Sequence, residues 1–203
     1  KKITVKGTNN IGVSVAQGTS TGDPLPKVTG LNIEVGGTGN VGFFRNSQGS
    51  YANPNAMVLD NTKMNSISFL GDAKESALIR SDKEEIKLDQ DITVGKIGIQ
   101  NTLLQAGKTG TVRLGSGRTV TSTSSDEFYG MTAGSFGAGT TGATIINDGT
   151  LVIGGNKSIA MAVDNGNSGE SSGTITYTGN NASAIYNKGL FHVKAGSTTS
   201  VTG

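Results

Sequence analysis

The 203-residue chain contains no cysteine, which excludes a disulfide framework and a cysteine-based metal site. Tryptophan is also absent, and there are only 3 prolines. No apolar run approaches the length of about 18 residues that a transmembrane helix needs, so none is predicted. No signal peptide opens the chain, and its first residues already follow a strand pattern, so we interpret it as a mature or excised fragment.

Charge is also scarce. Charged residues make up 16% of the chain, the net charge is +2, and no basic cluster is longer than Lys1-Lys2, so a nucleic-acid partner has no electrostatic support. The hydrophobic share of 33% is low, but disorder would require a higher net charge. The 32 glycines, together with many Thr, Ser, Asn, Val and Ile residues, are typical of an all-β chain with many tight turns.

One strand–corner–strand unit is repeated along the chain. It is clearest at residues 3–13, 33–43, 67–77, 151–161 and 175–185. Weaker copies begin near Ile86 or Ile92, at Val112 and at Phe191. Together they make about eight units of roughly 25 residues, within the range of solenoid repeats.

The pattern inside each unit has a direct physical interpretation. Apolar and polar residues alternate, so each short strand has one buried face. A glycine such as Gly7 or Gly37 permits a positive φ at the corner. A second corner, Asn-x-Gly, occurs in residues 145–151 and 184–190, which we interpret as equivalent. Two corner types and a third, less regular connection predict a three-sided coil of parallel strands.

The unit length is uneven, and the extra residues predict loops that leave the coil. We expect loops at 17–29, 45–64 and 122–141, within a single β-helix domain that covers 1–203. All prolines lie in the first two loops, which keeps them out of the strands. The helix-like composition of 72–89 is interpreted as strand, because 67–77 fits the repeat.

Aromatic residues in or beside the loops are the main candidates for ligand binding, because exposed Tyr, Phe and Arg side chains anchor interfaces. They form two groups: Phe43, Phe44, Arg45 and Tyr51 in one, and Phe128, Tyr129 and Phe136 in the other. The alternative is that these aromatic side chains pack under their own loops or cap the core.

Little in the sequence suggests catalysis. The acidic cluster Asp82, Glu84, Glu85, Asp89 and Asp91 matches no calcium motif, and we interpret it as a solvated strand edge. His192 is the only histidine and alternates with apolar neighbours, so it should point outward. We therefore predict no catalytic residues, no metal site and no cofactor, and hence no enzyme.

The repeats at 146–163 and 173–189 resemble the passenger region of large type V autotransporter adhesins. They are most similar to the fusobacterial kind, whose rungs follow N-x-G-T-I…G-x-N-x-S-x-A-I/M. The resemblance is clear over 143–203, fair over 1–45 and weak between. It implies a right-handed parallel β-helix on the bacterial outer surface, which the repeats would build from about eight rungs. It also implies adhesion to a protein or glycan of host cells or other bacteria. The segment would be extracellular, monomeric and not inserted in the membrane.

Three alternatives remain open at the level of sequence. A polysaccharide lyase or hydrolase also uses parallel β-helices, and fold alone does not decide function. A trimeric adhesin of left-handed β-roll repeats would need shorter repeats and heptads, and none are found. A non-binding structural spacer would need nothing beyond the coil.

Overall fold

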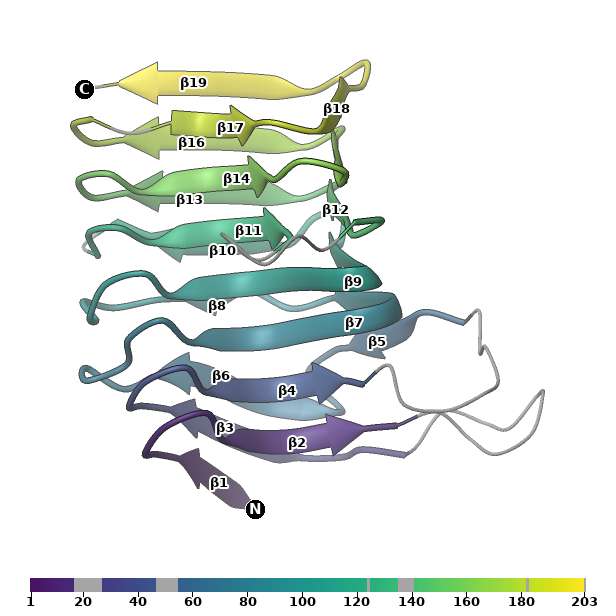
Figure 1. The fold of residues 1–203 in the computed structure, drawn as a ribbon, viewed down its shortest axis with the longest axis vertical. Coiled ribbons are helices and arrows are strands. Elements are labelled where there is room, and N and C mark those ends of the chain that lie inside the picture. The colour runs from purple at the N-terminus through teal and green to yellow at the C-terminus, as the bar shows by residue number, and fades with distance from the viewer. Residues whose placement is uncertain (17–26, 47–54, 124, 135–140, 182, 203) are drawn as a thin grey trace.

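The computed structural model describes residues 1–16, 27–46, 55–123, 125–134, 141–181 and 183–202. These residues form only strands and turns, and they contain no helix that could cross a membrane. The strands stack as a parallel β-solenoid, with the N-terminus at the bottom of Figure 1 and the C-terminus at the top. Near strands run to the right and far strands to the left as the chain climbs (Figure 1), so the coil is right-handed, as predicted. A left-handed β-roll is thereby contradicted.

Each turn has three faces. The first face holds β1 (Lys2–Val5), β3 (Leu31–Val35), β6 (Met64–Phe69), β8 (Ile92–Thr93), β10 (Thr119–Ser122), β13 (Thr150–Gly154), β16 (Thr174–Thr178) and β19 (Thr198–Thr202). The second holds β2 (Ile11–Val15), β4 (Val41–Arg45), the first halves of β7 (Ala77–Leu88) and β9 (Thr102–Leu114), β11 (Tyr129–Ala133), β14 (Ile159–Val163) and β17 (Ser183–Asn187). The third holds β5 (Met57–Leu59), the second halves of β7 and β9, β12 (Thr144–Asn147), β15 (Ser168–Ser171) and β18 (Leu190–Val193).

Within the described residues, about six turns are complete, fewer than the eight predicted. Two of the weak copies were assigned to the wrong face. Val112 and Phe191 begin no new turn, because they lie in the third-face strands β9 and β18. The first-face strands of these turns carry Val120 and Thr199 instead.

The strand register confirms the clearest repeats. Ile3 pairs with Ile33 in one part of the coil, and Leu151 pairs with Ile175 in another. The copy at 67–77 was aligned wrongly at its end. Ala77 pairs with Val41 and not with the following phenylalanine, because this corner is two residues longer.

The two Asn-x-Gly corners are not equivalent in space, so that interpretation was wrong. In one, Gly149 follows the third face, and in the other, Gly189 follows the second. Locally they are the same turn: Asn147 Oδ1 accepts the Gly149 N–H at 3.2 Å, and Asn187 Oδ1 accepts the Gly189 N–H at 3.1 Å. The motif therefore encodes a bend and not a particular corner of the coil.

Polar side chains form a buried ladder inside the corner between the first and second faces, which we call the first-to-second corner. Asn40 Oδ1 accepts the Asn10 N–H at 2.6 Å, and Ser76 Oγ accepts the Asn40 N–H at 3.0 Å. Asn101 Oδ1 accepts the Ser76 N–H at 3.0 Å. These bonds satisfy backbone groups that the bend removes from the sheets.

The expected loops prove too wide. The range 45–64 contains β5, the range 122–141 contains β11, and both strands belong to the coil. The stretch 72–89 contains β7 and no helix, as expected. The remaining loop residues at 17–26, 47–54 and 135–140 lie outside the described residues. Each of these ranges follows the end of a second-face strand, at what we call the second-to-third corner.

Candidate functional site

Two phenylalanines of the predicted patches lie in the hydrophobic core. Phe43 and Phe128 are fully buried. Phe43 pairs with Ile79 of the next turn, and the ring of Phe128 meets that of Phe69 edge-on, with centroids 6.4 Å apart. The prediction that these two rings bind a ligand is wrong, because the coil needs large side chains here to fill its interior.

Arg45 is also buried, with a side chain only 1% exposed. One of its NH groups donates to the carbonyls of Asn55 at 3.1 Å and Glu85 at 2.6 Å. Another donates to Glu84 Oε2 at 2.8 Å. Burial lowers the pKa of the guanidinium against the opposing effect of these two glutamates. Arg45 thus joins β4 to the next turn, and its prediction as an exposed anchor is wrong.

The other members of the two patches have different positions. Phe44 is half-buried in the second face, and the guanidinium carbon of Arg80 lies 5.6 Å from the centre of its ring. Arg80 is held there by Asp82, whose Oδ1 accepts its Nε–H at 2.7 Å. Tyr51 and Phe136 lie outside the described residues.

Tyr129 lines a pocket of about 400 Å³ beside the first-to-second corner. Ala77 and Thr102 pair in register between the larger Val41 and Tyr129, and these two short side chains leave a depression. The volume is within the range of roughly 300–1,000 Å³ that is usual for ligand pockets. We call it the amide pocket, and it is lined by Glu75, Ser76, Ala77, Gln100, Thr102, Gln105 and Tyr129.

Two glutamines give the amide pocket its chemical character. Gln100 is exposed and Gln105 is half-buried. In the described part of the chain, neither side-chain amide has a hydrogen-bond partner. Each amide can donate and accept at the same time. The coil itself leaves both amides available to a polar ligand.

The backbone at the rim of this pocket is strained. Gln100 has a φ of 61° and Glu75 a φ of 51°, and the next two turns place Glu127 at 49° and Lys157 at 56° in the same position. Such left-handed conformations cost a residue with a side chain about 1–2 kcal/mol. Bonds between turns hold them in place, for example from the Gln100 N–H to the Glu127 carbonyl at 2.9 Å.

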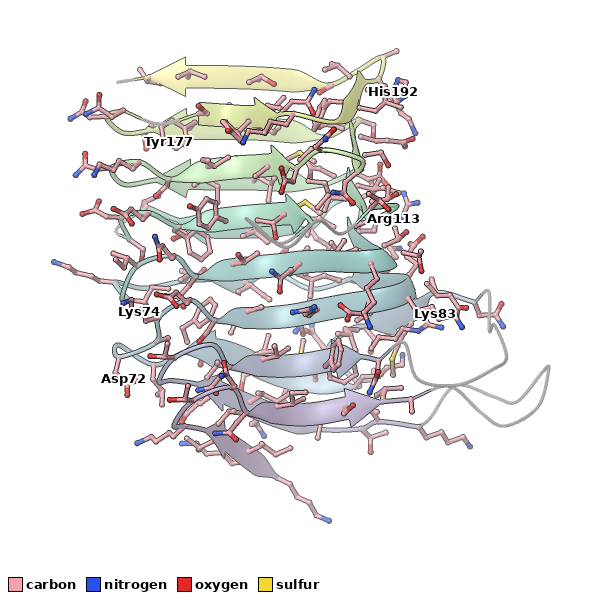
Figure 2. All side chains as sticks on the ribbon, in the orientation of Figure 1. Asp72, Lys74, Lys83, Arg113, Tyr177 and His192 are labelled. Atoms are coloured by element: carbon pink, nitrogen blue, oxygen red, sulfur yellow. The ribbon has the colours of Figure 1, made fainter. Side chains whose placement is uncertain are left out.

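The same corner in the outer turns carries Asn9, Gly39 and Asn181, which are residue types that suit a positive φ. Four consecutive middle turns therefore replace suitable residues with long polar ones. Lys74, labelled at the left edge of Figure 2, precedes the first of them and marks this corner. Conformational outliers of this kind concentrate at functional sites.

The charges around the amide pocket are balanced. Lys74 Nζ lies 3.3 Å from Glu75 Oε1, and both side chains are 48% exposed. Lys157 Nζ lies 3.7 Å from the carboxylate of Glu127. Burial, followed by the charge of Glu127, raises the pKa of Tyr129, so its hydroxyl keeps its proton at neutral pH. The site offers hydrogen-bonding groups and an aromatic ring without excess charge.

A second polar cluster lies on the third face, around Arg113, at the right edge of Figure 2. Its Nε lies 2.8 Å from Glu85 Oε1, and another of its nitrogens lies 2.5 Å from Asp148 Oδ2. Burial works to lower the pKa of Arg113, but the two carboxylates outweigh it and the pKa is raised. Burial likewise opposes ionisation of Asp148, but bonds from Ser172 and Arg113 leave its pKa lowered. The cluster is a set of satisfied ion pairs.

The acidic cluster is not a solvated edge, so that interpretation was wrong. Three of its five carboxylates bind the arginines already described. Asp89 Oδ1 lies 3.2 Å from Arg118 Nε, and Asp91 accepts the Thr119 N–H at 2.7 Å. Within the described ranges, no group of acidic, His or Cys residues could hold a metal ion. His192 is exposed on β18, as expected (Figure 2).

Sequence reasoning missed Glu75, Gln100 and Gln105. Aligned on the second-face strands, Glu75 and Gln100 occupy the position of Asn9 and Gly39. The available signal was a long polar residue at the position where other copies of the repeat have Gly or Asn. It was hidden because the corner at Glu75 is longer than in the first two copies.

Comparison with protein-family models, with curated proteins and with solved structures finds no match to this chain. The described residues form a right-handed parallel β-solenoid with a polar pocket on its second face.

Proposed function

We propose that this chain is a segment of a bacterial cell-surface adhesin that attaches to a protein or glycan of host cells or other bacteria. The repeat resemblance at 146–163 and 173–189 suggests this class. The observation that supports binding is the amide pocket, in which two amides lack partners among the described residues. The segment is extracellular and monomeric in this proposal.

The coil suits this role mechanically. Stacked turns lie about 4.8 Å apart, so six turns extend roughly 30 Å and hold the second face rigid. The predicted loops begin at the far edge of that face, where β2, β4 and β11 end.

Attachment is tested with beads coated with the 203-residue chain and applied to epithelial cells and to bacteria. Soluble chain is added as competitor, and a heat-unfolded coating is the control. The proposal expects retention that the folded competitor abolishes. If beads with the folded coating are retained no better than beads with the unfolded coating on every cell type, the chain is only a structural spacer. Light scattering that detects a trimer would contradict the proposed monomer.

A polysaccharide-degrading enzyme is the second candidate, because Glu85, Arg113 and Asp148 converge on one face of adjacent turns. Its weakness is that none of these residues lines the amide pocket. Incubation with acidic and neutral polysaccharides, with and without Ca²⁺, tests it. Product that disappears in Arg113→Ala would establish the enzyme and displace the adhesin proposal.

A further inference from the structure

We propose that the amide pocket binds a neutral saccharide, with Gln100 and Gln105 bonding its hydroxyl groups and Tyr129 contacting its ring. This inference rests on the proposed function and names the class of ligand. It combines the chemistry of the lining residues, their balanced charge, and strain at the rim.

The lining groups match a sugar hydroxyl in kind. A hydroxyl donates one hydrogen bond and accepts others, and a side-chain amide can meet both needs. Gln100 and Gln105 supply two amides that no described residue engages. Other polar groups nearby are already used: Ser76 Oγ donates to the Lys74 carbonyl at 2.8 Å and accepts the Asn40 N–H.

The apolar part of the pocket consists of short side chains. Ala77 and Thr102 form its floor, and both are nearly buried, at 4% and 6% exposure. Tyr129 is half-buried beside them in the next turn. An aromatic ring next to amides is suited to a pyranose, because the face of the ring packs against the apolar C–H groups of the sugar while the amides bond its hydroxyl groups.

Charge balance selects a neutral ligand. Glu75 is paired with Lys74, and Arg80, which is in register with Gln105, is paired with Asp82. No cation among the lining residues is left for a sialic acid or a sulfated sugar. A neutral saccharide loses no charge–charge attraction in such a site and leaves no buried charge unpaired.

Strain at the rim is an independent argument. Gln100 adopts a φ of 61° in a position where the outer turns use Asn or Gly. Its side chain forms no bond within the described coil that would offset the strain. The left-handed conformation is explained if it directs the Gln100 amide at a ligand, since backbone outliers of this kind are retained at binding sites.

The test measures binding of neutral probes (lactose, N-acetyllactosamine, maltotriose and chitotriose) and charged probes (sialyllactose and a sulfated lactose) to the whole 203-residue chain by ligand-observed NMR and calorimetry. We expect saturable binding of at least one neutral probe. We also expect an affinity at least tenfold lower in Gln100→Gly and in Gln105→Ala. The melting temperature of Gln100→Gly should be unchanged or higher.

The matched control is Lys157→Gly, because Lys157 has the same backbone conformation two turns away and does not line the pocket. It should keep full affinity and gain the same stability. Binding of charged probes only, binding of none, or unchanged affinity in Gln100→Gly would each overturn the saccharide site. If coated beads still attach to protein on cells under those outcomes, the adhesin proposal stands without this site.

Discussion

The two corners that bound the second face use strained residues in different ways. At the second-to-third corner, Glu84 has a φ of 58° and Lys108 a φ of 46°, and each side chain pairs with a residue of the preceding turn. Glu84 pairs with the buried Arg45, and the ammonium of Lys108 lies 3.8 Å from Asp82. The strain here accompanies contacts that join successive turns.

At the first-to-second corner, the two strained side chains that line the amide pocket form no side-chain hydrogen bond or ion pair with another turn within the described ranges. Gln100 has no partner among the described residues, and Glu75 pairs only with an exposed lysine. Stability here comes from the buried ladder of Asn40, Ser76 and Asn101 beneath them. The difference indicates that one corner is built for cohesion and that the outer surface of the other is free for recognition.

The largest effect should come from breaking the cohesive corner. Arg45→Ala leaves Glu84 and two carbonyls without their buried donor, so we expect the free energy of unfolding to fall by about 3–5 kcal/mol. Urea unfolding followed by circular dichroism measures the change. The double variant Arg45→Met with Glu84→Gln removes both charges and should recover part of the loss. A loss below about 1 kcal/mol in Arg45→Ala would show that the pair contributes no cohesion.

The contrast between these corners explains which parts of the fold the sequence could predict. The pairing of Leu151 with Ile175 was predictable, because residues alternate with period two and the corner glycine is present. The middle turns were not. β7 continues across the second-to-third corner without a glycine or Asn-x-Gly signal, and its register with β9 shifts between Ser81 and Lys83. β9 carries glycines at this corner and still continues as one strand. A strand that bends through a corner looks like one long strand in the sequence.

The site was only partly predictable for a related reason. Tyr129 was named from its residue type, and the same rule selected Phe43 and Phe128, which fill the core. Residues in register through successive turns form a column, which faces either the core or the solvent. Residue type does not identify the column of a side chain, because bends where the strands begin interrupt the alternation of inward and outward side chains. The two glutamines could be recognised only from their column, which required the register.

The next largest effect should come from the buried ladder of the other corner. Asn101 is fully buried, and its amide donates to the carbonyls of Ala73 at 2.7 Å and Gly98 at 2.9 Å. Asn101→Ala leaves these groups and the Ser76 N–H unpaired, at a cost of about 2–3 kcal/mol. Urea unfolding measures it. The neighbouring Gln100→Ala removes no described side-chain bond and should cost less than about 0.5 kcal/mol, so equal losses would show that the ladder does not hold this corner.

Strain at the recognition corner predicts a smaller effect of opposite sign. Gln100→Gly relieves about 1–2 kcal/mol of left-handed strain and loses about 0.5–1 kcal/mol to glycine's freedom when unfolded. We expect a net gain of about 0.5 kcal/mol. The reverse change, Gly117→Ala, introduces the same strain at a φ of 73° with no atom within 4 Å of the new methyl group, and should lose a similar amount. Gln100→Gly that destabilises the chain would mean that the side chain stabilises the coil.

The smallest effect concerns Asp60, which lies at neither corner and so tests whether electrostatics outside them matters. Bonds from the Thr62 hydroxyl first, then from the Lys63 and Thr62 N–H groups, lower its pKa to about 2. The folded pKa is below the unfolded value of about 3.9. The stabilisation is therefore present above pH 4 and disappears as the pH falls from about 4 to about 2. Because the side chain is 33% exposed and solvent screens its charge, the effect should be slight.

Urea midpoints of the wild-type chain and Asp60→Asn should differ at pH 6 and converge at pH 2. Asp72→Asn is the control, because Asp72 is an exposed carboxylate at the other end of β6 with no hydrogen bond among the described residues. Its difference from wild type should stay near zero at both pH values. A difference for Asp60→Asn that persists undiminished at pH 2 would mean that the side chain acts through its shape and not its charge, because most of the charge-dependent stabilisation is lost once the pH reaches the folded pKa.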